Sequence, residues 1–196
     1  MLRRMTNAAR SLNYGQGKEA LLGATIRVVA TRGLRGLTFR AVAEEAGVNN
    51  TLIAHHFGTR DRLLAAALDW TLDRSIAAAD LSEYATDAHA FREALVENVL
   101  SAPDEEIFQF EMILESSRRP ELRPAVRHLY ERYVEALAKG REALGADTSD
   151  ALNLAMFAAL DGLMLQYLSH AITAEQLADA VEALGVAVGN VSEPAD

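Results

Sequence analysis

The chain has 196 residues, of which half are apolar and none is cysteine, and its formal net charge is −9. This length and apolar fraction suffice for one domain, or for two small ones that share a core. The absence of cysteine excludes a disulfide framework, a thiolate zinc site and a catalytic thiol, and it fits a reducing cell interior.

The charge is distributed unevenly along the chain. Residues 1–70 carry ten Lys and Arg against five Asp and Glu, whereas residues 71–196 carry nine against 23. Such asymmetry suggests that the N-terminal end meets a polyanion, although a short stretch can also hold such an excess by chance. The start does not resemble a secretory signal, and the longest apolar runs are about a third of a membrane span. We therefore expect a cytoplasmic protein with no membrane partner.

Apolar residues recur at helical spacing and no stretch alternates as a strand does, so we expect an all-α fold of about nine helices. The first helix is expected over 18–31, ending before Gly33. Thr38 is a good N-cap for a second helix that ends at Gly47. A third helix over 49–57 follows at once, and Thr59 then caps a long fourth helix. The later helices are expected over 87–100, 103–117, 119–145, 148–170 and 173–190.

Two adjacent histidines, His55 and His56, raise the question of a metal site or a proton carrier. Neighbours on a helix point about 100° apart, so these rings cannot easily chelate one ion together. Neither His pairs at i, i+4 nor Glu-x-x-His motifs occur in the chain. YGQGKEA at 14–20 is not a phosphate loop, because one residue instead of four separates its glycines. We therefore expect no metal, no cofactor and no catalytic residue.

The third helix has two distinct faces. Its inward sector is apolar apart from one histidine and holds Leu52, Ile53, His56 and Phe57. Its other side is short and polar and holds Asn50, Thr51, Ala54 and His55. A helix of this kind, preceded closely by another short helix, is typical of a helix-turn-helix, whose second helix enters the major groove of DNA. Asn can bond bidentately to adenine, and Thr offers a hydroxyl or a methyl group to a base.

The segment LTFRAVAEEAGVNNTLIAHHFGTRDRLLAAALD resembles the DNA-binding segment of the TetR family of transcriptional regulators. The resemblance covers about residues 18–69 and rests on the Thr-capped helix, the AEEAGV turn, the helix ending HHF, and the Gly-Thr-Arg and Leu pair that follow. A weaker similarity lies in AALDGLMLQ at 158–166, which is similar to a stretch of the helix that pairs subunits in many members.

The resemblance implies DNA contacts from Thr38, Arg40, Asn49, Asn50, Thr51, His55 and Arg60. Thr38 and Arg60 would contact phosphates, and a guanine contact would come from Arg40, since the third helix carries no Lys or Arg. Ala54 departs from the family, which often has an aromatic residue there that touches the DNA backbone. That contact is therefore missing or is supplied elsewhere, for example by the tail residues Arg3, Arg4 or Arg10.

The eighth helix, 151–168, is apolar nearly all round, which is typical of a helix covered on every side. We expect one side to face its own core and the other a second copy of the chain, and a buried central helix of a monomer is the alternative. The expected interface residues, from this helix and the last one, are Leu152, Met156, Leu160, Leu163, Tyr167, Leu177, Val181, Leu184 and Val188.

The resemblance also implies a cavity for an unknown small-molecule effector, surrounded by the fourth to seventh helices. The candidate lining residues are Trp70, Phe91, Leu95, Phe108, Met112, Tyr130, Tyr133, Val134 and Phe157. Aromatic residues and methionine at helical spacing are equally typical of plain core. The polar candidates for orienting an effector also fit solvated helix faces, and they are Glu111, Glu115, His128, Asp161 and His170.

These features predict a flexible basic tail (1–17), a helix-turn-helix DNA-binding domain (18–60), a helical effector-binding and dimerisation domain (61–190) and a second tail (191–196). The expected function is transcriptional regulation, as a homodimeric repressor that binds a palindromic operator in double-stranded DNA and is released by the effector. The alternative is an architectural or adaptor helical protein that binds DNA without strong sequence specificity. Such binding falls steeply with salt whatever the sequence.

Overall fold

The computed structural model describes residues 14–78, 96–97, 100–143, 145 and 149–189. All regular elements in these ranges are helices, as the sequence predicts. Of the two expected tails, residues 1–13, with Arg3, Arg4 and Arg10, and residues 191–196 lie outside the described residues, whereas residues 14–17 are helical instead of forming part of a tail. So does most of the expected helix over 87–100, including Phe91 and Leu95.

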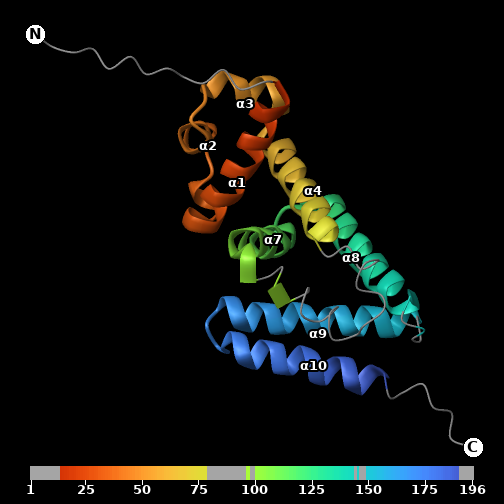
Figure 1. The fold of residues 1–196 in the computed structure, drawn as a ribbon. Coiled ribbons are helices and arrows are strands. Elements are labelled where there is room, and N and C mark those ends of the chain that lie inside the picture. The colour runs from red at the N-terminus through yellow and green to blue at the C-terminus, as the bar shows by residue number, and fades with distance from the viewer. Residues whose placement is uncertain (1–13, 79–95, 98–99, 144, 146–148, 190–196) are drawn as a thin grey trace, which may run out of the picture. The chain divides into compact units, whose positions relative to one another are not determined.

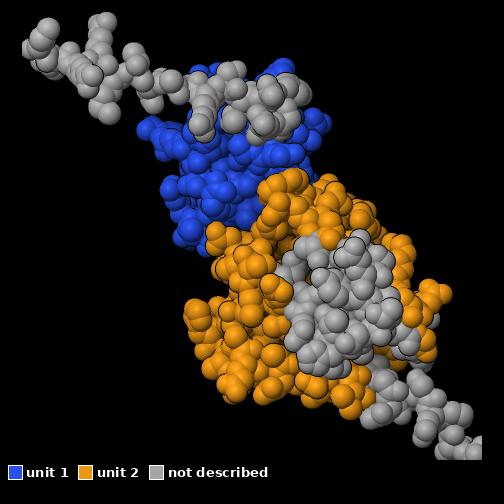
Figure 2. Space-filling view, viewed as in Figure 1, with its two compact units in different colours: residues 1–67 blue, residues 68–196 orange. Residues whose placement is uncertain are grey.

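The chain divides into two compact units, unit 1 (Met1–Ala67) and unit 2 (Leu68–Asp196), which are coloured separately in Figure 2. Unit 1 holds α1 (Tyr14–Gly36), α2 (Phe39–Ala46), α3 (Asn50–Phe57) and the first turns of α4 (Arg60–Ala78) (Figure 1). Its apolar core comes from all four helices and includes Leu21, Ile26, Val42, Ile53 and Leu63.

Local signals in the sequence explain where the helices of unit 1 begin and end. The Thr38 hydroxyl accepts a hydrogen bond from the Ala41 amide at 3.0 Å and so caps α2. Gly47 ends α2 with φ 67° and ψ 28°, a left-handed conformation that suits glycine. α1 extends beyond the expected 18–31, because Gly33 (φ 65°) makes a kink after which the chain returns to helix as far as Gly36.

Unit 2 holds the rest of α4, α7 (Pro103–Ser116), a 3-10 turn η1 (Pro120–Leu122), α8 (Arg123–Ala143), α9 (Asp150–Leu168) and α10 (Ala174–Gly189). The single helix expected over 119–145 is therefore broken near its start. Pro124 lies in the first turn of α8, where a missing amide proton removes no helical hydrogen bond.

α9 and α10 run side by side as an antiparallel pair (Figure 1). Thr173 and Gln176 form a capping box at the start of α10. The Gln176 amide donates to the Thr173 hydroxyl at 3.2 Å, and the Thr173 amide donates to the Gln176 side-chain oxygen at 2.9 Å. These two bonds fix the point at which the chain turns back along α9.

Candidate nucleic-acid interface and internal cavity

The burial of α3 follows the two faces expected from the sequence. Ile53 is 0% exposed and Phe57 is 6% exposed, and together they anchor the helix in unit 1. The opposite side is exposed over its whole length, at Asn50, Thr51, Ala54 and His55. His56 is partly buried, and its ring lies against Phe57 with centroids 5.9 Å apart, so it belongs to the packed side. The exposed side is therefore free to meet another surface.

Two of the expected DNA contacts also hold the helices in shape. The Asn49 side-chain oxygen accepts hydrogen bonds from both the amide and the hydroxyl of Thr51, each at 3.0 Å. Asn49 thus caps α3 just as Thr38 caps α2, and all three side chains are exposed. The first turn of α3 is fixed before any partner arrives.

The two expected arginine contacts differ in how firmly they are held. Arg40 is 84% exposed and pairs with Glu44 one helical turn away, with Nε and Oε1 2.8 Å apart. An ion pair this exposed contributes little to stability, so Arg40 can exchange Glu44 for another anion. Arg60 is partly buried and donates a hydrogen bond to the backbone carbonyl of Leu34 near the end of α1. Arg60 therefore has a structural role besides the phosphate contact that the resemblance implies.

His55 and His56 lie with their ring planes tilted by 59° and their centroids 5.7 Å apart. Across the described residues, no group of three or more His, Asp or Glu side chains could hold a metal ion. Of the adjacent histidines, His55 thus lies at an exposed position and His56 at a packed one.

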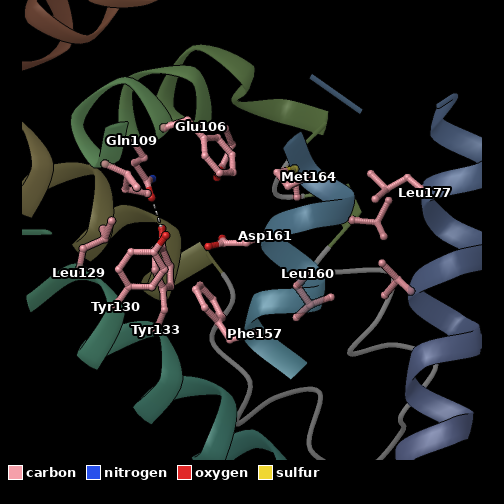
Figure 3. A pocket seen from close by; sticks show the side chains of 14 residues that line it. Glu106, Gln109, Leu129, Tyr130, Tyr133, Phe157, Leu160, Asp161, Met164 and Leu177 are labelled. Atoms are coloured by element: carbon pink, nitrogen blue, oxygen red, sulfur yellow. Dashed lines mark hydrogen bonds between the residues drawn. The ribbon is translucent and has the colours of Figure 1, made fainter. Parts of the chain in front are cut away.

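Unit 2 contains a cavity of about 90 Å³, measured as the space open to the centre of a water molecule. Its walls come from α7, α8, α9 and α10, and Figure 3 shows the side chains that line it. The lining residues are Val96, Glu106, Gln109, Phe110, Ile113, Leu129, Tyr130, Tyr133, Phe157, Leu160, Asp161, Met164, Leu177 and Val181.

Three of the expected lining residues, Tyr130, Tyr133 and Phe157, do line this cavity. Phe108 and Met112 do not: both are 0% exposed and lie on the other side of α7, in the core. Trp70 and Val134 are also absent from the walls. The guanidinium carbon of Arg74 lies over the Trp70 ring, 4.7 Å from the ring centroid. The expectation for these four residues is therefore wrong for this cavity.

The sequence reasoning missed two polar residues in the cavity wall, Glu106 and Gln109. Together with Phe110 and Ile113 they follow i, i+3, i+4, i+7 spacing, which defines one face of a helix. Glu106 and Gln109 share this helix face with apolar residues. Polar residues on such a face were the signal in the sequence that could have pointed to a polar site there. Asp161, named only as one of several polar candidates, faces them from α9.

The cavity raises the pKa of both carboxyl groups. Burial, followed by the negative charges of Asp161 and Glu105, raises the pKa of Glu106 to about 7. Burial also raises the pKa of Asp161, and a hydrogen bond with Tyr130 opposes that change. On the same wall the Tyr133 hydroxyl bonds to the Gln109 side-chain oxygen at 3.0 Å (Figure 3).

α9 also carries exposed apolar side chains. Leu154 is 59% exposed and Leu165 is 50% exposed, and their separation of eleven residues puts them on one face of the helix, next to the cavity-lining Asp161. Asn153, about 100° around the helix from Leu154, is 1% exposed. α9 is long and apolar enough to meet the length and composition criteria for a membrane span, with 6% of it buried.

Several expected interface residues lie elsewhere. Leu177 and Val181 are 1% and 6% exposed and line the cavity, as does Leu160, because these side chains point into the subunit. The remaining expected residues with described side chains, Leu152, Met156, Leu163, Tyr167 and Leu184, are partly exposed. The side chain of Val188 lies outside the described set.

Sequence comparisons match both units to known families. Residues 21–67 match bacterial regulatory proteins of the tetR family, and residues 85–188 match the tetracyclin repressor-like C-terminal domain. The regulator PksA of Bacillus subtilis is 34% identical over 59 residues, 30% of this chain and 29% of PksA. The transcriptional repressor Rv3405c of Mycobacterium tuberculosis is 38% identical over 76 residues, 36% of this chain and 40% of that protein. The matches span less than half of these curated relatives.

Two solved structures are similar over most of the chain. A TetR-family transcriptional regulator from Rhodococcus is 26% identical with a TM-score of 0.76, covering 90% of this chain and 98% of the other. The multidrug binding protein EbrR complexed with proflavin is 30% identical with a TM-score of 0.59, covering 86% and 99% respectively. Both units of this chain therefore have counterparts in solved proteins.

Proposed function

This chain belongs to the TetR family of bacterial transcriptional regulators, and we propose that it is a homodimeric repressor that leaves a palindromic operator when a small molecule binds. The observation that carries the proposal is the exposed polar face of α3, with Asn50, Thr51 and His55 on a helix anchored by Ile53 and Phe57. A rigid helix of this kind can present Asn and Thr side chains to base edges in the major groove.

The exposed face of α9 supports dimerisation through a second copy of the chain. Leu154 and Leu165 on α9 leave much of their side chains uncovered, as does Val186 (52% exposed) on the neighbouring α10. Exposed apolar patches of this kind mark association surfaces, and a two-fold axis lets one patch cover its own copy. Two reading helices held by one dimer can recognise both halves of a palindrome.

α4 offers a route from the cavity to the reading helices. In unit 1 its first residue, Arg60, bonds to the end of α1. Its later residues contact the cavity helices of unit 2: Arg74 pairs with Glu105 of α7 at 3.1 Å, and Asp73 pairs with Arg132 of α8 at 3.6 Å. A ligand that favours one arrangement of α7 and α8 would shift α4, and the spacing of the two reading helices, by population shift. EbrR, crystallised with imidazole and with proflavin, supports a small-molecule role for the cavity.

The test is fluorescence-anisotropy binding to DNA fragments from around the chain's own gene, against scrambled DNA, across a salt series. We expect one fragment to bind far more tightly than scrambled DNA, with that preference surviving moderate salt. Binding that is equal for all fragments and is lost as salt rises would contradict the repressor proposal and favour the architectural alternative.

Matched variants locate the reading face. Thr51→Ala and His55→Ala should relax the preference at particular base pairs by about 1–3 kcal/mol. Thr31→Ala and His128→Ala, which alter exposed residues of α1 and α8, should leave it unchanged. An unchanged site preference in both α3 variants would show that another surface reads the DNA.

A further inference from the structure

The cavity of unit 2 combines four aromatic rings, those of Phe110, Tyr130, Tyr133 and Phe157, with two carboxyl groups. Phe157 stacks on Tyr133 with ring centroids 5.3 Å apart, and it meets Tyr130 edge to face at 5.9 Å. Figure 3 shows Asp161 extending from α9 toward the two tyrosines, and Glu106 lines the same space from α7. Among the described residues, no Lys, Arg or His lines the cavity.

The charges of these carboxyl groups are not balanced by the described part of the chain. The nearby basic side chains are engaged elsewhere: Arg74 pairs with Glu105, and Arg132 pairs with Asp73. Glu106 and Asp161 instead act on each other as like charges. A carboxylate in an apolar enclosure is costly unless a positive charge accompanies it. The cavity wall therefore suits an occupant that carries a positive charge, because the described residues do not supply one.

Gln109 gives an independent indication that the cavity receives a ligand. This side chain is 4% exposed and lines the cavity, and its oxygen accepts a hydrogen bond from the Tyr133 hydroxyl. Its amide nitrogen is buried and has no hydrogen-bond partner among the described residues. Because buried polar groups nearly always have partners, this donor is available to an occupant, for example to the face of an aromatic ring.

We propose that the cavity binds a compact organic cation, an ammonium group on an apolar body, between Glu106, Asp161 and the rings of Tyr130, Tyr133 and Phe157. Aromatic faces attract ammonium groups, and the carboxylates neutralise their charge. The proposal rests on the effector-binding function proposed above and adds the chemical class of the effector.

The size of the cavity narrows the class further. A space of about 90 Å³ favours a compact occupant. Benzylamine is a compact probe that carries an ammonium group at neutral pH. Benzyl alcohol has the same shape without the charge, and benzoate carries the opposite charge.

The experiment is isothermal titration calorimetry of the full chain with these three probes, at a pH above 7. We expect benzylamine to bind at least tenfold more tightly than benzyl alcohol, and benzoate to bind more weakly than either. Glu106→Gln and Asp161→Asn should each weaken benzylamine binding about tenfold and leave benzyl alcohol binding unchanged. Glu111→Gln, on the same helix but outside the cavity wall, is the matched control and should change neither.

Two results would overturn the proposal: benzyl alcohol binding as tightly as benzylamine, or no benzylamine binding at all. The comparison of probes on the unaltered chain decides this even where a variant fails to fold. Operator binding is measured separately with and without each probe. If benzylamine binds in the cavity but the operator complex stays intact, the proposed release of DNA by an effector is refuted and the proposed cation site still stands. Release by benzyl alcohol alone would keep the effector function and refute the cation class.

Discussion

The Glu106 carboxyl group should make the stability of unit 2 depend on pH, and Glu106→Gln should remove that dependence. Burial first, and then the charges of Asp161 and Glu105, raise the pKa of Glu106 from 4.5 to about 7. Between these two pH values the folded chain keeps a proton that the unfolded chain has released. The contribution of Glu106 to stability is therefore full below pH 4.5 and is lost as the pH rises through about 7.

The size of this effect follows from the two pKa values. A change from 4.5 to about 7 corresponds to at most about 3.5 kcal/mol, because each pKa unit is worth about 1.4 kcal/mol. The groups that face Glu106 are Asp161 from α9, Tyr133 from α8 and Glu105 on its own helix, which pairs with Arg74 of α4. Asp161 and Glu105 carry negative charge and Tyr133 is neutral in this pH range, so ionisation of Glu106 meets mainly like charges.

The assay is urea unfolding followed by tryptophan fluorescence at a fixed protein concentration, from pH 4.5 to above 7. Trp70 is the only tryptophan in the chain and lies in unit 2, so its signal reports on this unit. The unaltered chain should lose roughly 2–3 kcal/mol more than Glu106→Gln over this range, and Glu111→Gln should follow the unaltered chain. Equal pH dependence in the unaltered chain and Glu106→Gln would refute the reasoning.

Three further predictions test the interface and unit 1. Leu154→Glu should weaken the dimer by at least about 2–4 kcal/mol, because each subunit then loses part of the burial of one leucine. Leu114→Glu, which changes a residue of α7 that is 63% exposed, should leave dimerisation unchanged. Light scattering over a dilution series measures the dimer fraction of both variants. Arg60→Ala should destabilise unit 1 by about 1–3 kcal/mol through loss of its hydrogen bond to α1, and Arg62→Ala by much less, as measured by thermal unfolding. Gly47→Ala, at φ +67°, should cost about 1–2 kcal/mol in the same measurement, and an unchanged melting temperature would contradict the left-handed turn.

The division of α3 into two faces could be predicted from the sequence because it depends on helical geometry alone. Once residues 50–57 are placed on a helix, Ile53 and Phe57 must lie on one side and Asn50 and Thr51 on the other. The caps at Thr38 and Asn49 are equally local, since each bond joins residues two or three positions apart. Local chemistry therefore suffices for most of the helix-turn-helix.

The cavity could not be predicted in the same way, because α7 has two faces suited to burial. Phe108 and Met112 lie on one face, and Phe110 and Ile113 lie on the other with Glu106. Which face borders a space depends on where α8 and α9 pack, and that is a property of the whole unit. An aromatic residue and a methionine at helical spacing pointed to Phe108 and Met112, which lie fully buried in the core.

α9 shows a related limit. It is apolar on every side, so its sequence has no periodicity that separates an inner from an outer face. The packing of Asn153 toward the interior, with Leu154 exposed, becomes visible only in the structure. The same holds for α10, where Leu177 and Val181 were expected to face a partner and instead line the cavity.

The cap of α3 limits what Thr51 can recognise. Its hydroxyl proton is directed to the Asn49 side-chain oxygen at 3.0 Å, so the hydroxyl is left with lone pairs alone to offer outward. A base facing this oxygen must therefore supply a proton, and in the major groove only the exocyclic amino groups of adenine and cytosine do so. In the proposed DNA complex, the bond to Asn49 would leave Thr51 able only to accept a hydrogen bond from a base, and so would disfavour guanine and thymine oxygens at its position.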